Sequence, residues 1–99
     1  MSAKVGERVG AVSHTDQDNI YLFGFGVYQG EKVPPRGIKF MGVELNLMNH
    51  FNPCILLDNG KEVWGCECWW GPEATVKKQM EGRKVVELDI EAERSKTNA

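Results

Sequence analysis

The sequence predicts a mainly β domain, a small SH3-like curled barrel of four to five strands with one short helix near the C-terminus. Three observations predict it: short stretches rich in aromatic and β-branched residues, an Asn59-Gly60 turn between two of them, and one helical pattern after Pro72. The eleven glycines are spread over the 99 residues, as is typical of turns and strand bends. An open α+β sheet is the alternative.

The N-terminal third predicts two strands. Glu7–Thr15 alternates weakly between apolar and polar residues, and Ile20–Gln29 is rich in aromatic and β-branched residues. Gly24 and Gly26 supply the flexibility that a sharp strand bend in a small barrel needs. The Pro-Pro-Arg-Gly stretch at 34–37 then breaks the chain.

The segment Ile38–Phe51 fits two periodicities, and we expect a loop with a short helical turn. The helical stripe comprises Ile38, Met41, Leu45 and Met48, and the strand pattern comprises Val43, Leu45 and Leu47.

The clearest local signal is a β-hairpin formed by Cys54–Asp58 and Lys61–Trp70 around Asn59-Gly60. It predicts a two-residue turn with positive φ at both central positions, which pairs Ile55 with Trp64. One face then carries Ile55, Leu57, Trp64, Cys66, Cys68 and Trp70, and the other carries Cys54, Leu56, Val63, Gly65 and Trp69.

The C-terminal third predicts a helix over Pro72–Met80, with Gly82 as its stop. Lys84–Ile90 alternates as a final strand, with Val86, Leu88 and Ile90 pointing inward. We expect one barrel-like domain over residues 1–91 and a polar, frayed C-terminal tail over 92–99.

Composition excludes several classes of protein. The chain is 41% hydrophobic and 26% charged, as in ordinary globular domains. A formal net charge of −2 disfavours a nucleic-acid binder that relies on a general positive field. No apolar run is long enough for a membrane span, so we expect a cytoplasmic protein that does not bind membranes.

The three cysteines favour the same compartment, because an odd number is unusual in a small secreted domain. Cys54, Cys66, Cys68 and His50 could supply four soft ligands for zinc. The expected register places Cys54 on the face opposite the other two thiols, and there is no Cys-x-x-Cys knuckle, so we expect no metal and no cofactor.

The predicted strands are apolar on both faces, which is unusual in so short a chain. The Pro72–Met80 helix, a second subunit of a homo-oligomer, or a ligand would each explain this pattern.

Aromatic side chains are the strongest indication of function, since they gather in two segments and combine an apolar body with a polar edge. Arg36 and Lys39 follow the second strand and are suited to an anionic group. The predicted ligand-binding residues are Tyr21, Phe23, Phe25, Tyr28, Arg36, Lys39, Trp64, Glu67 and Trp69.

No nucleophile–base pair or metal cage is recognisable, so we expect a protein that is not an enzyme. The hypothesis is a non-catalytic binding protein for a small planar anionic ligand such as a nucleotide. The alternative is a protein-interaction module that docks on a host protein through the same aromatic face.

The run Asn52–Glu73, with its LDNGKEVWGCECWWGPE core, resembles a stretch found in small uncharacterised proteins that are often phage-encoded. The Leu22–Tyr28 run is of similar character. The resemblance implies a phage accessory protein acting in the host cell cytoplasm. It also implies an anti-defence role, in which such a protein sequesters a nucleotide signal of the host.

Overall fold

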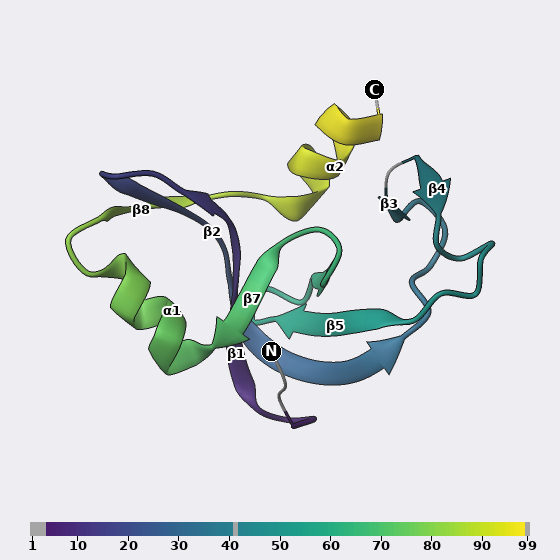
Figure 1. The fold of residues 1–99 in the computed structure, drawn as a ribbon, viewed down its shortest axis with the longest axis horizontal. Helices are drawn as coiled ribbons and strands as arrows, with labels where there is room; N and C mark the ends of the chain where they lie inside the picture. Colours follow the sequence, from purple (N-terminus) through teal and green to yellow (C-terminus); the bar gives the residue numbers. More distant parts are fainter. Residues whose placement is uncertain (1–3, 41, 99) are drawn as a thin grey trace.

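The fold is an open sheet of six strands with two short helices, and the computed structural model describes residues 4–40 and 42–98 (Figure 1). The strands lie in the order β6-β5-β2-β1-β7, and β8 pairs with a second stretch of β2. In chain order the elements are β1 (Arg8–Thr15), β2 (Asn19–Lys32), β3 (Lys39–Phe40), β4 (Val43–Glu44), β5 (Asn52–Leu57), β6 (Glu62–Trp64), β7 (Trp69–Pro72), α1 (Glu73–Met80), β8 (Lys84–Glu87) and α2 (Ile90–Asn98).

Strand β2 is the central strand of the sheet, because its 14 residues pair with three other strands. Along one edge it pairs with β1, antiparallel. Along the other edge Asn19–Leu22 pairs with β8, parallel, and Gly26–Lys32 pairs with β5, antiparallel. Gly24 lies between these two stretches with φ +142°, a conformation that favours glycine.

The predicted barrel is wrong, and the open α+β sheet fits. Strands β6 and β7 form opposite edges of the sheet and do not pair with each other in the described part of the chain. Many apolar residues of both faces are buried without closure, because α1 covers one part of the sheet and the 34–51 segment covers another. Gly26 is required for close packing of two strands, since a Cβ there would overlap the carbonyl oxygen of Leu56.

The β5–β6 hairpin exists, but its predicted register is wrong by one residue. Ile55 pairs with Val63, and Cys54 pairs with Trp64. The loop has three residues, 58–60, and only Gly60 has positive φ (+89°). Such a loop, a type I turn completed by a glycine, uses the same Asn-Gly pair as the shorter turn. The one-residue shift exchanges the two faces of β6.

Three clusters of buried side chains make up the core. The largest lies on one face of the sheet and comprises Val9, Ala11, Phe23, Tyr28, Ile55, Leu57, Val63 and Ile90. The second lies beneath α1 and comprises Val12, Ile20, Leu22 and Val76. The third comprises Ile38, Leu45, Cys54 and Trp64, so the 34–51 segment covers the Cys54 face of the hairpin.

Helix α1 and the inward side of β8 agree with the sequence-based expectation. The helix covers Glu73–Met80, Gly82 follows it with φ +73°, and Val86 is less exposed than Val85. Residues expected as a frayed tail form α2 instead, which the buried Ile90 begins.

The expected helical turn in 38–51 is not formed. The two short strands β3 and β4 pair there, and turns follow them. Met41, one member of the expected stripe, lies outside the described residues. Of the other three, Ile38 and Leu45 are buried and Met48 is exposed.

Candidate functional site

The aromatic residues predicted to bind a ligand do not form one surface. Phe23 and Tyr28 belong to the largest buried cluster, and Trp64 belongs to the third. Phe25 packs against the α1 cluster. The Tyr21 ring stacks on His14 with a centroid distance of 4.1 Å, and Trp69 is exposed. Most of these rings therefore pack within the core.

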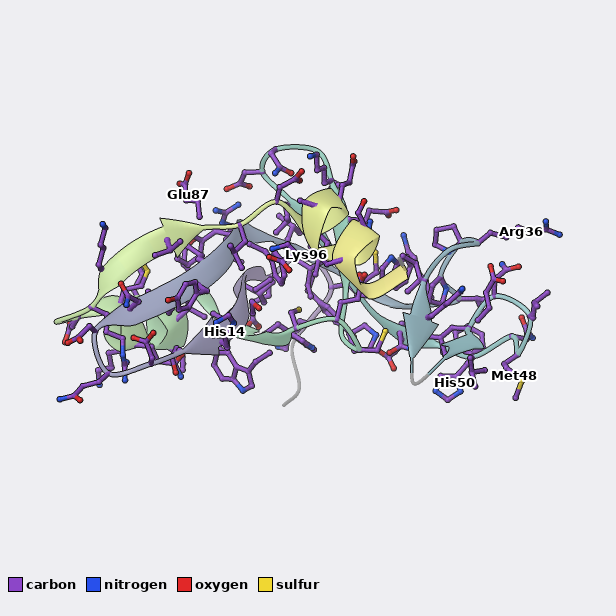
Figure 2. The ribbon with its side chains drawn as sticks, turned by 90° about the horizontal axis from the view of Figure 1, so that it is seen from above. His14, Arg36, Met48, His50, Glu87 and Lys96 are labelled. Atoms are coloured by element: carbon purple, nitrogen blue, oxygen red, sulfur yellow. The ribbon has the colours of Figure 1, made fainter. Side chains whose placement is uncertain are left out.

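The two predicted cations have different surroundings. Figure 2 shows Arg36 at one end of the molecule, projecting into solvent. Lys39, three residues later, lines a pocket beneath α2. Three of the nine predicted residues, Phe23, Lys39 and Glu67, come together at this pocket.

This cavity, the α2 pocket, has a volume of about 260 Å³. Strand β3 and the residues just before it, the turn after β6, strands β1 and β2, and helix α2 all contribute to it. Its lining residues are Ser13, Phe23, Gly37, Lys39, Cys66, Glu67, Ile90, Glu93 and Arg94.

A bidentate ion pair forms one wall of the α2 pocket. Arg94 Nε donates to Glu67 Oε2 at 2.7 Å, and Arg94 Nη2 donates to Glu67 Oε1 at 2.8 Å. Nη2 also donates to the carbonyl oxygen of Glu62 at 2.8 Å. The side chains of Arg94 and Glu67 are only 24% and 11% exposed, and Glu67 raises the pKa of Arg94. The pair therefore holds a charged, oriented wall in place.

Local geometry explains why Glu67 points inward. The chain turns sharply after β6, where the backbone N–H of Glu67 donates to the carbonyl of Trp64 at 2.8 Å. The carboxylate then accepts from the backbone N–H of Trp64 at 3.1 Å. Both contacts lie within the turn, so they orient the carboxylate without any contribution from α2.

A β-bulge brings Ser13 to the pocket. Val12 pairs with Leu22 and His14 pairs with Tyr21, which leaves Ser13 as the extra residue of β1. Bulges re-aim side chains in this way. The hydroxyl of Ser13 lies 2.9 Å from His14 Nδ1 and can exchange hydrogen bonds with a polar ligand.

One of the cations that line the α2 pocket has no ion-pair partner among the described residues. Glu67 is bound by Arg94, and Glu93 is bound by Lys96 at 3.5 Å. Lys39 makes no ion pair with any described residue. Arg94 Nη1 likewise donates to no other described group. These two groups can receive an anion.

The thiols have little nucleophilic character at neutral pH. Burial raises the pKa of Cys54 and of Cys68 to about 12, and burial also raises the pKa of Cys66. Among the residues that the structure describes, no group of three or more histidine, cysteine or acidic side chains could hold a metal ion.

Sequence reasoning missed Ser13, Ile90 and Arg94 as site residues, and it missed Arg94 because that residue lies in the stretch expected to fray. One signal was present: Arg94 follows the inward-facing Ile90 by four residues, which places both on one face of a helix.

No protein-family model, curated protein or solved structure matches the chain. The resemblance of the Asn52–Glu73 run to phage-encoded proteins therefore stays a prediction. In residues 4–40 and 42–98, no helix is both long and apolar enough to cross a membrane.

Proposed function

We propose that this protein is a non-catalytic binding protein that holds a small planar anionic ligand, such as a mononucleotide, in the α2 pocket. The observation that carries the proposal is the unpaired ammonium of Lys39 beside the fixed guanidinium of Arg94. A cavity whose acidic groups already have partners, while one lysine has none, favours an anion.

The lining suggests how such a ligand would lie. Its anionic group would contact Lys39 Nζ and Arg94 Nη1, and its flat apolar part would pack against Phe23 and Ile90. The hydroxyl of Ser13 would accept or donate one hydrogen bond. The volume of about 260 Å³ is near the lower end of the roughly 300–1,000 Å³ typical of small-molecule pockets, which favours one small ligand over a dinucleotide.

The alternative function, docking on a host protein through one aromatic face, has less support because most of the aromatic rings are buried in separate clusters. Sequestration of a nucleotide signal of host defence is the cellular role consistent with the proposal. That role follows from the resemblance to phage-encoded proteins.

A ligand series with matched variants tests the proposal. The probes are AMP, adenosine and inorganic phosphate, measured by calorimetric titration and by thermal unfolding of the full chain. At ten times its Kd, a ligand that binds only the native state stabilises it by about 1.4 kcal/mol, which raises Tm by about 5–10 °C. We expect AMP to bind more tightly, and to raise Tm more, than adenosine or phosphate, because each of those supplies only half of the contacts.

The decisive variants are Lys39→Met and its control Arg36→Met. Both remove an exposed cation from the same segment, but only Lys39 lines the α2 pocket. We expect Lys39→Met to weaken AMP binding about tenfold, which corresponds to about 1.4 kcal/mol, and Arg36→Met to leave it unchanged. The proposal is wrong if AMP, GMP, CMP and UMP all fail to bind, or if the two variants lose affinity equally.

A further inference from the structure

One end of the molecule carries exposed apolar side chains. In the 43–51 segment, Leu47, Met48 and Phe51 are 72%, 65% and 60% exposed, and Val43 is 45% exposed. We call these four residues the tip. Figure 2 shows Met48 and His50 at the same end as Arg36. Exposed apolar residues gathered in so short a segment indicate a contact surface.

The surroundings of the tip are positively charged. Residues 31–51 contain three basic side chains, Lys32, Arg36 and Lys39, and two carboxylates, Glu31 and Glu44. The carboxylate of Glu44 accepts a hydrogen bond from the backbone N–H of Gly37 at 2.8 Å. None of the three cations forms an ion pair within the described residues. A chain with a net charge of −2 thus concentrates unpaired positive charge at one end.

A groove of complementary character lies away from the tip. Strands β8 and β5 pair with separate stretches of β2, and between them a groove of about 660 Å³ opens over residues 23–25. Its apolar lining is Leu22, Phe23, Phe25, Leu57, Met80, Val85 and Leu88, and its charged lining is Asp58, Lys61, Glu87 and Asp89.

The rim of this groove is negatively charged. Lys61 is neutralised by Asp89 at 2.6 Å, and Asp58 is bound by Arg8 at 2.7 Å. Glu87 forms no ion pair in the described part of the chain. Figure 2 shows Glu87 toward the end of the molecule opposite Arg36 and Met48.

We propose that the tip of one copy docks into the groove of a second copy, head to tail. Leu47, Met48 and Phe51 would pack on the apolar floor, and the cations beside them would face the acidic rim. Because the two surfaces differ and lie at opposite ends, the contact is heterologous, and its repetition produces open filaments or closed rings of copies. The proposal does not rest on ligand binding, because the groove and the α2 pocket share only Phe23. Lys32 and Arg36, which do not line the α2 pocket, are the cations on which the docking contact depends.

A complementation experiment tests this arrangement, with light scattering after size-exclusion chromatography as the measurement. The tip variant is Leu47→Ser with Met48→Ser, and the groove variant is Val85→Ser with Glu87→Lys. All four positions are exposed, and circular dichroism checks that each variant folds. The control is Leu56→Ser, because Leu56 is 39% exposed, close to the 38% of Val85, but lies outside the groove.

We expect the wild type to form species larger than the 11.1 kDa monomer as its concentration rises. Each double variant should weaken this association about tenfold or more, and the control should not. A mixture of the two double variants should form a 1:1 dimer, because one intact tip can still meet one intact groove.

Three outcomes would overturn the proposal. If the wild type stays monomeric at all concentrations, the tip does not bind a second copy and its partner is a different protein. A mixture of the double variants that stays monomeric would indicate a symmetric contact. Equal dissociation of Leu56→Ser would show that the contact lies elsewhere. If the tip double variant fails to fold, Phe51→Ser replaces it.

Discussion

The 34–51 segment differs from the rest of the fold, which is the sheet with its two helices, in the pairing of its charged side chains and the burial of its apolar ones. Every ion pair in the described residues joins groups outside 34–51, and the largest buried cluster also lies outside it. Among the residues of this segment whose burial is described, Pro34, Ile38 and Leu45 are buried, whereas Val43, Leu47, Met48 and Phe51 are exposed, as are Arg36 and Lys39. Stability therefore resides in the sheet and helices, while the segment keeps groups available for contacts with other molecules.

The largest expected effect compares truncations in the two regions. Ile55 is fully buried in the sheet, and Leu47 is 72% exposed in the segment. We expect Ile55→Ala to lower the free energy of unfolding by about 2–5 kcal/mol, because it leaves a cavity. Leu47→Ala should change it by less than about 0.5 kcal/mol. Urea unfolding measures both, and similar losses would remove the distinction between the regions.

A smaller effect is expected where α2 joins the sheet. Arg94→Met leaves the carboxylate of Glu67, which is 11% exposed, with only a backbone partner. We expect a loss of about 1–3 kcal/mol, and Arg94→Lys should recover only part of it because an ammonium cannot bind bidentately. The matched control is Lys96→Met on the same helix, where the side chain is 75% exposed.

Amide hydrogen exchange shows which part of the protein the Arg94→Met substitution destabilises. Amides of α2 should exchange faster in Arg94→Met than in Lys96→Met, while those of β1 and β2 should keep their protection. Uniform acceleration over the sheet would contradict a local role for the Arg94–Glu67 pair.

The smallest effect concerns acid stability. The hydrogen bond from Arg8 lowers the pKa of Asp58. A carboxyl group whose pKa is lower in the folded state stabilises the protein above its unfolded pKa of about 3.9, and this contribution is lost as pH falls through the folded pKa. Asp58→Asn should therefore flatten the decline of Tm below about pH 4. Added salt should reduce the difference, because both groups are exposed. An unchanged slope would show that the ion pair contributes nothing.

Local signals in the sequence were sufficient for some elements. Pro72 and Gly82 bracket α1, and the alternation after Lys84 correctly orients Val86, whereas the expected strand ends at Glu87 and Ile90 begins α2. These features depend on neighbours within a few residues, so one sequence contains what is needed to recognise them.

Features that depend on distant contacts were not predictable in this way. Asn59-Gly60 suits both a two-residue and a three-residue loop, and the choice between them sets the register of the whole hairpin. Whether β6 meets β7 decides between a barrel and an open sheet, and their pairing has no local signature. The Arg94–Glu67 pair joins groups 27 residues apart in the sequence, so the α2 pocket emerges only in three dimensions.

The most direct test of the central claim is an NMR titration of the ¹⁵N-labelled protein with AMP, following backbone amides and the Nε–H of Arg94. The account predicts shift changes that cluster at Ser13, Phe23, Lys39, Cys66 and Arg94, the residues that line the α2 pocket. The tip should be unaffected. Changes confined to the tip or the groove, or no change at saturating AMP, would contradict the claim that the α2 pocket binds a small anion.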